Sequence, residues 1–248
     1  LRKLGRHKEA LKCFYQTIKI EPKNADFWHN IGLDLYILYK YQKALTFFNQ
    51  ALKIKPQYYS ALYYKGNALR YLGRYKKALV CYDHALKIDP KYARAWCSKG
   101  DALLALDRHR EAFTCYTKAV GIDSKSADAW YGKGYALVEL GRYKEALACY
   151  TQALKIDPKD ASVWHSKGYA LGELDRYKEA LACYDQVLKI APRNEKIWFL
   201  KGYALGKLGK CKESLACYSQ GLKIDSKDAE AWYGKGYALA ELGRHKET

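Results

Sequence analysis

The sequence lacks methionine altogether and has only 5 prolines among its 248 residues, and no apolar stretch approaches the roughly 18 residues of a membrane-spanning helix. No basic segment followed by an apolar one opens the chain, so nothing predicts a secretory signal. We therefore expect a soluble, cytoplasmic protein. Because the first residue is Leu1 and methionine is absent, we also expect an internal fragment of a longer chain, with any targeting or catalytic segment elsewhere.

Catalytic motifs are missing as well. The chain has no HExxH, no GxSxG and no phosphate-cradling glycine loop, and its six histidines are scattered over positions 7, 29, 84, 109, 165 and 245. An enzyme needs a nucleophile, a base and an orienting group that converge in one pocket. The sequence therefore predicts no enzyme, no metal site and no cofactor.

Six of the eight cysteines are separated by multiples of 34 residues, and no CxxC pair accompanies them. They are Cys13, Cys81, Cys115, Cys149, Cys183 and Cys217. This spacing indicates one column of a repeat rather than a disulfide framework or a zinc site. We expect these thiols to be buried and reduced.

The same interval of 34 residues governs the apolar residues. One column is tryptophan, with Leu62 as its single exception, and a glycine follows four residues later in every copy. The tryptophans are Trp28, Trp96, Trp130, Trp164, Trp198 and Trp232, and the glycines are Gly32, Gly66, Gly100, Gly134, Gly168, Gly202 and Gly236. Leucine, alanine and aromatic columns complete the unit, so the chain is built from repeats.

The full pattern, W-x3-G-x2-L-x8-A-x3-[FY]-x2-A-x4-P, resembles the tetratricopeptide repeat (TPR), a helix-turn-helix unit, over the whole chain. Periodicity agrees, because Trp130, Gly134 and Leu137 share one helical face, as do Ala146 and Tyr150. Each repeat thus contains two amphipathic helices, here named helix A and helix B. The resemblance implies an all-α fold, a right-handed α-solenoid of stacked repeats with the A helices on its concave side.

This register predicts a single TPR solenoid over residues 1–248. It consists of a partial repeat (helix B) at 1–24, six full repeats at 25–58, 59–92, 93–126, 127–160, 161–194 and 195–228, and a partial repeat (helix A) at 229–248. The two incomplete repeats present complementary apolar faces. We therefore predict that the chain can associate head to tail with further copies of itself.

Glycines stand where helix A ends, at positions 5, 73, 141, 209 and 243, which predicts a left-handed cap there. Asp107 and Asp175 occupy the same position and tolerate that conformation. Tyr39 does not fit it, so we expect the turn of the first full repeat to deviate.

Positions 5 and 9 of helix A, counted from the first residue of each repeat, project away from the tryptophan and glycine face. By the resemblance they line the concave groove. The candidate partner-binding residues are His29, Tyr63, Asn67, Tyr131, Tyr135, His165, Tyr169, Phe199, Tyr203, Tyr233 and Tyr237. Because tyrosine combines a broad apolar ring with a polar tip, we predict that this groove binds a peptide segment or helix of a partner protein. Alternatively, neighbouring rings pack on each other and only stiffen the superhelix.

Helix B carries lysines on its outward side, which predicts a basic convex face. Its residues are Lys8, Lys19, Lys76, Lys87, Lys144, Lys155, Lys178 and Lys189. Residues 1–92 contain 18 basic and 6 acidic residues, a net +12 of the total +18. Such a surface attracts nucleic acid or merely keeps the solenoid in solution. A nucleic-acid-associated repeat protein and the regulatory arm of a larger enzyme are therefore the alternatives to peptide binding.

Overall fold

The computed structural model describes residues 7–244, with Arg244 described only in its backbone. These residues form fourteen α-helices and no strand, which confirms the all-α class. No helix among them combines the length and the apolar character that crossing a bilayer requires. The A helices are α2 (Ala25–Ile37), α4 (Tyr59–Tyr71), α6 (Ala93–Leu104), α8 (Ala127–Glu139), α10 (Ala161–Gly172), α12 (Glu195–Lys207) and α14 (Ala229–Arg244). The B helices are α1 (His7–Ile20), α3 (Tyr41–Ile54), α5 (Tyr75–Ile88), α7 (His109–Ile122), α9 (Tyr143–Ile156), α11 (Tyr177–Ile190) and α13 (Cys211–Ile224).

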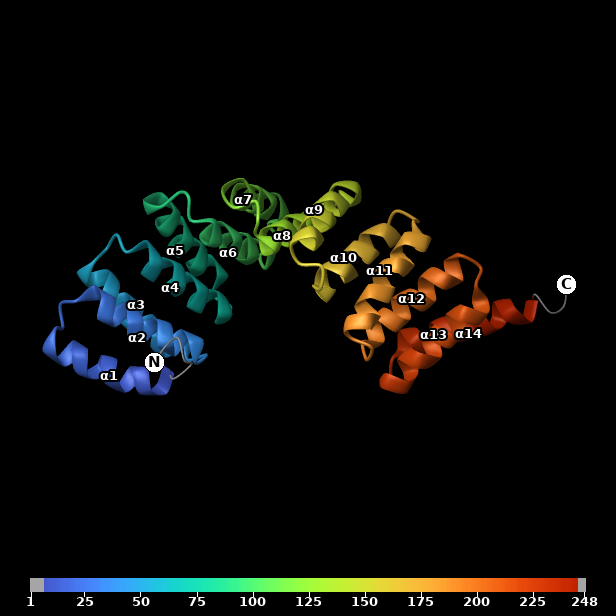
Figure 1. Ribbon diagram of the computed structural model, residues 1–248, viewed down its shortest axis with the longest axis horizontal. Coiled ribbons are helices and arrows are strands. Elements are labelled where there is room, and N and C mark those ends of the chain that lie inside the picture. The colour runs from blue at the N-terminus through green and yellow to red at the C-terminus, as the bar shows by residue number, and fades with distance from the viewer. Residues whose placement is uncertain (1–6, 245–248) are drawn as a thin grey trace. The chain divides into compact units, whose positions relative to one another are not determined.

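The helices belong to two compact units, a first unit of residues 1–124 and a second unit of residues 125–248. Within each unit every helix packs against the next one along the chain (Figure 1). Some successive A helices also touch each other, namely α2 and α4, α4 and α6, α8 and α10, and α12 and α14. Contacts confined to the same and the adjacent repeat are typical of a solenoid. The division into repeats at the expected boundaries stays a prediction.

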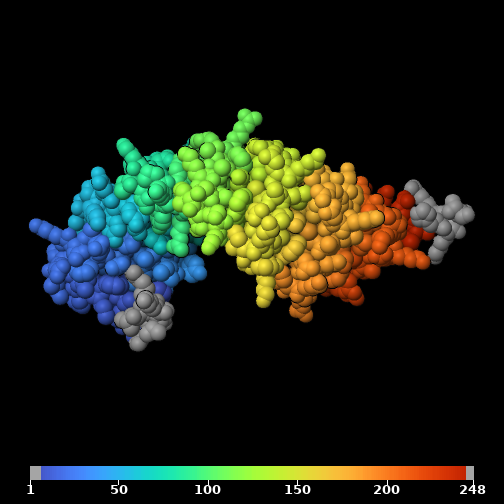
Figure 2. Space-filling model, turned by 45° about the horizontal axis from the view of Figure 1, so that its top comes forward, coloured from blue at the N-terminus to red at the C-terminus, as the bar shows by residue number. Residues whose placement is uncertain are grey.

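The core of each repeat lies where a glycine of helix A faces an aromatic ring of helix B. A methyl group added at Gly134 would lie 2.6 Å from the Tyr150 ring, and one added at Gly66 would lie 2.6 Å from the Tyr82 ring. Beside each ring, the alanine column of helix B is fully buried. Small residues therefore let the two helices approach until the ring fills the space between them. On the outside, the side chains of α10 to α14 (yellow to red) form a continuous surface (Figure 2).

The tryptophan column ties helix A to the loop that precedes it. Trp28 Nε1 donates a hydrogen bond to the carbonyl oxygen of Pro22 (2.8 Å), and Trp164 Nε1 donates one to that of Pro158 (2.9 Å). Trp232 makes the equivalent bond to Ser226 (2.9 Å), where the proline is missing. The bond thus depends on the indole and the loop backbone, and the tryptophan column is structural.

The turns between helix A and helix B contain one residue in the left-handed region. Gly73, Gly141 and Gly209 have φ of 70 to 71°, as predicted. Gly5 lies outside the described residues. The prediction for Gly243 is wrong, because α14 continues through it to Arg244 and no following helix packs against it in the described part of the chain.

The expectation that the first full repeat would turn differently is also wrong. Tyr39 has φ of 58°, beside 56° at Asp107 and 57° at Asp175. Its N–H donates to the carbonyl oxygen of Tyr36 (2.9 Å), and the N–H of the next residue donates to Leu35 (2.8 Å). The equivalent two bonds are present in all the remaining described A-to-B turns. The backbone hydrogen bonds therefore impose the left-handed conformation on tyrosine as well.

The cysteines are all free thiols. In the predicted column, Cys81, Cys115, Cys149, Cys183 and Cys217 are buried. Cys13 is exposed, contrary to the prediction, because no helix A precedes α1 among the described residues.

Candidate functional site

In the first unit, the predicted groove residues are internal. The His29 ring stacks on Tyr58 with ring centroids 4.8 Å apart, and its Nε2 lies 3.1 Å from the hydroxyl of Ser60. Tyr63 packs edge-on against Tyr92, with centroids 4.9 Å apart. Both side chains are buried. Here the rings pack on neighbouring aromatic residues, as the alternative interpretation of the aromatic residues proposed.

Asn67 is also buried, and sequence reasoning missed its structural role. Its Oδ1 accepts a hydrogen bond from the hydroxyl of Tyr82 (2.7 Å), the ring that faces the glycine column. Asp101 does the same for Tyr116 (2.7 Å). A polar residue at position 9 paired with tyrosine fifteen residues later was the available signal. We therefore leave His29, Tyr63 and Asn67 out of any partner-binding surface.

In the second unit, the tyrosines at position 9 are exposed. Tyr135 of α8, Tyr169 of α10 and Tyr203 of α12 keep 39%, 41% and 46% of their surface open to solvent, and we name these three the tyrosine row. Within residues 125–244 no ring contact joins Tyr135 to Tyr169 or Tyr169 to Tyr203. The ring contacts of the tyrosine row that are present there join Tyr135 to Tyr131 and Tyr203 to Tyr177. Their rings therefore do not serve to pack one A helix on the next.

The aromatic residues at position 5 lie deeper. Tyr131, His165 and Phe199 are half-buried, and burial lowers the pKa of His165. Phe199 touches Tyr218 of helix B, with ring centroids 5.8 Å apart. The side chains at position 5 are therefore less exposed than those of the tyrosine row, and the Tyr131 ring contacts that of Tyr135. In α14, which no later helix covers in the described chain, Tyr233 is exposed as well.

A charged residue follows each member of the tyrosine row by one helical turn. Burial raises the pKa of Tyr135, and the neighbouring Glu139 carboxylate raises it further. Tyr169 is affected in the same way by burial and then by Glu173. Beside Tyr203 the neighbouring charge is positive instead, because Lys207 Nζ lies 5.3 Å from the centroid of the Tyr203 ring. The surface along the row is therefore acidic over two repeats and basic at the third.

Next to Tyr203 the surface deepens into a pocket of about 630 Å³ between α12, α13 and α14. Its aromatic walls are Phe199, Tyr203, Tyr218, Tyr233 and Tyr237. The structure thus brings together four predicted groove residues, two from each of two A helices. Sequence reasoning missed Cys211, which also lines the pocket and breaks a column of aromatic residues at the first position of helix B.

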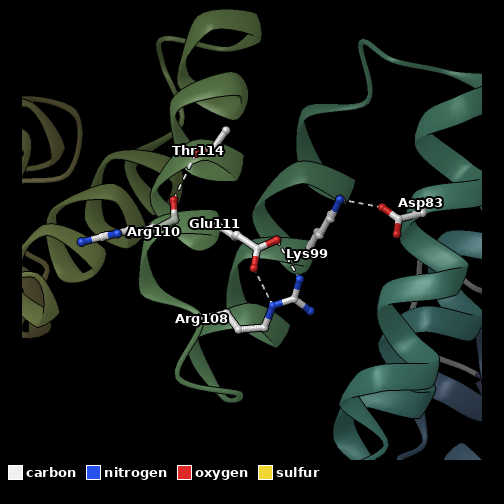
Figure 3. Close-up of polar contacts among 6 residues, drawn as sticks. All are labelled: Asp83, Lys99, Arg108, Arg110, Glu111 and Thr114. Atoms are coloured by element: carbon white, nitrogen blue, oxygen red, sulfur yellow. Dashed lines mark hydrogen bonds and ion pairs between the residues drawn. The ribbon is translucent and has the colours of Figure 1, made fainter.

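The predicted basic residues of helix B are all exposed, and none forms an ion pair with another described residue. Other cations of the same repeats are bound. In Figure 3, Arg108 holds both carboxylate oxygens of Glu111 (2.6 and 2.7 Å), and Lys99 of α6 pairs with Asp83 of α5 (2.6 Å). The bound cations support helices, and the unpaired lysines form a solvated surface.

Two further predictions concern metals and self-association. No cluster of three or more His, Cys, Asp or Glu side chains suited to a metal ion occurs among residues 7–244. On α14, Trp232 and Leu239 are exposed, and Gly236 has no ring beside it. Head-to-tail association through this helix stays a prediction.

Comparison with known families decides what these helix pairs are. Models of the tetratricopeptide repeat match residues 25–58, 127–160 and 161–194, and a TPR repeat model matches 66–107, 100–141 and 202–243. Together the matches span most of the chain. This protein belongs to the tetratricopeptide repeat family. Its TPR units form a scaffold for protein interactions. The TPR fold is typically not catalytic.

Solved structures share the TPR fold. YrrB, described as a TPR protein with an unusual peptide-binding site, is 22% identical with a TM-score of 0.68, and the match covers 76% of this chain and 97% of YrrB. PilF of Pseudomonas aeruginosa is 17% identical (TM-score 0.75; 86% of this chain, 97% of the other). One chain of the APC/C hetero-tetramer Cut9–Hcn1 is 15% identical (TM-score 0.75; 95% of this chain, 46% of the other). No curated protein sequence matches the chain.

Proposed function

We propose that this TPR scaffold binds an extended peptide segment of a partner protein along the tyrosine row. The observation that carries the proposal is the exposure of Tyr135, Tyr169 and Tyr203 at the same position of three successive A helices, without ring contacts to one another. A tyrosine ring that stays this exposed contributes less to folding than a buried one. Tyrosine in such a setting is typical of binding hot spots.

The arrangement favours a linear ligand. One ring per repeat offers equivalent contacts at regular intervals, which suits an extended chain better than a compact small molecule. The charges beside the row, Glu139, Glu173 and Lys207, give that ligand a preferred direction. YrrB, which is described as having a peptide-binding site, has the same fold. At 22% identity, that likeness supports the shared fold alone.

Selection from a displayed peptide library on the full 248-residue chain tests the proposal. We expect enriched peptides that bind the wild type and fail to bind the triple variant Tyr135→Ala, Tyr169→Ala, Tyr203→Ala. The matched control is Tyr15→Ala with Tyr59→Ala, because these tyrosines of the first unit have similar exposures of 39% and 40%. Peptides that bind the triple variant as well as the wild type would exclude the tyrosine row.

A further inference from the structure

Helix B begins with an aromatic residue in the earlier repeats, and α13 is the exception. Tyr143 opens α9, Tyr177 opens α11, and Cys211 opens α13. In the first unit the same position holds Tyr41, Tyr75 and His109. The cysteine therefore removes one ring from a regular series.

The contacts of Tyr177 show where that ring belongs. Its hydroxyl donates to Asp175 (2.6 Å), and its ring meets the edge of Tyr203, the row tyrosine of the following A helix, with centroids 6.4 Å apart. One repeat later, Tyr237 of α14 corresponds to Tyr203, and Cys211 is too short to reach across in the same way. The pocket of about 630 Å³, lined by Cys211 and Tyr237, lies at this place.

We propose that this pocket, the aromatic slot, receives a tyrosine or phenylalanine side chain of the bound peptide in the place that Tyr177 fills one repeat earlier. The inference rests on the peptide-binding function proposed above and names its anchor residue. Phe199, Tyr203 and Tyr233 line the slot with aromatic rings, and such rings attract a further aromatic side chain beyond the effect of buried area alone. The volume lies within the range of about 300–1,000 Å³ typical of ligand pockets.

Charges at the two ends of the slot define the neighbours of the anchor. Lys207 is the last residue of α12, and Glu230 lies in the first turn of α14. Because α13 reverses the chain direction between them, α12 and α14 run the same way, and the two charges stand at opposite ends of the slot. An acidic residue of the peptide pairs with Lys207, and a basic residue lies toward Glu230.

Titration of the full chain with N-acetyl-tyrosinamide, followed by NMR, tests the slot directly. We expect saturable shifts in the wild type and in Cys211→Ser, a loss of affinity of at least about tenfold in Cys211→Tyr, and weaker binding of N-acetyl-leucinamide. The added tyrosine of Cys211→Tyr fills the slot from within. The inference is overturned if the wild type shows no saturable shift, or if Cys211→Tyr binds the probe as well as the wild type does.

A second blocking variant covers the case in which Cys211→Tyr does not fold. A Cβ at Gly206 would meet only Ser214 Oγ, at 3.5 Å, so Gly206→Leu closes the slot from α12, and retained probe binding in this folded variant also overturns the inference. Tyr135→Ala with Tyr169→Ala separates the two proposals, because neither residue lines the slot. Peptides that depend on Tyr135 and Tyr169 while the probe does not bind refute the slot alone. Probe binding that Cys211→Tyr blocks, without any such peptide, supports the slot and refutes the row.

Discussion

Tyr177 and Tyr203 meet edge to face, with ring centroids 6.4 Å apart, where helix B of one repeat touches helix A of the next. The contact supports one side of the row tyrosine and leaves 46% of its surface open. Tyr237, which faces Cys211 in the following repeat, is 60% exposed. The change from an aromatic residue to Cys211 thus coincides with a pocket beside Tyr237.

The close approach of helix A to helix B predicts a steep cost for any side chain in the glycine column. Gly134→Ala places a methyl group 2.6 Å from the Tyr150 ring, and we expect a loss of about 1–2 kcal/mol in the free energy of unfolding, measured by urea denaturation. Gly236→Ala is the control, because no atom lies within 4 Å of the added group. That variant should be neutral or more stable by up to about 1 kcal/mol. Equal effects of the two substitutions would contradict the packing described.

The strained turn at Tyr39 predicts a stabilising substitution. A left-handed non-glycine residue costs roughly 1–2 kcal/mol, and the side chain is 80% exposed, so little packing is lost with it. Allowing for the greater freedom of glycine in the unfolded chain, Tyr39→Gly should raise the stability by about 0.5–1 kcal/mol. Gly73→Ala, with open space around its Cβ, should lower it by about 1 kcal/mol. A lower melting temperature for Tyr39→Gly would show that its ring has a role beyond the turn.

The buried cysteines predict selective chemistry. Burial raises the pKa of Cys115 and of Cys183 to about 11, so at pH 8 iodoacetamide should modify exposed Cys13 well before either of them, as peptide mass spectrometry of the native chain would show. Rapid native alkylation of Cys115 or Cys183 would contradict their burial. All three should react alike in denaturant.

The same thiols make stability depend on pH. The folded protein holds their protons more tightly than the unfolded chain, whose thiols titrate near pH 8.5. Their contribution is therefore complete below about pH 8.5 and is lost as the pH rises to about 11. Cys115→Val with Cys183→Val should flatten the decline of unfolding free energy over this window. A decline as steep as that of the wild type would assign it to other groups.

Much of the fold follows from the sequence because its periodic columns have direct physical causes. Gly134 and Tyr150 recur because the glycine leaves the space that the ring fills. The left-handed backbone of Tyr39 could not be predicted, because the conformational preference of tyrosine favours another turn. The backbone hydrogen bonds of the turn outweigh that preference.

The candidate site was harder to predict. Helical geometry predicts the direction in which the Tyr63 side chain projects but not which residues cover it. In the first unit, additional rings such as that of Tyr92 bury this side chain. In the second unit the same reasoning held for exposure, because no such rings cover Tyr169. The pocket beside Cys211 was visible in the sequence only as an interruption of a column.

The most direct test of the central claim is a fluorescence anisotropy titration of a library-selected peptide with the wild type, with the triple variant of the tyrosine row, and with the control Tyr15→Ala, Tyr59→Ala. Peptide binding along the row predicts a rise in Kd of roughly 100-fold or more for the triple variant, because one hot-spot tyrosine contributes about 2 kcal/mol, or about 30-fold in Kd, and such contributions add only in part. The same account predicts an unchanged Kd for the control. An unchanged Kd for the folded triple variant would contradict the claim.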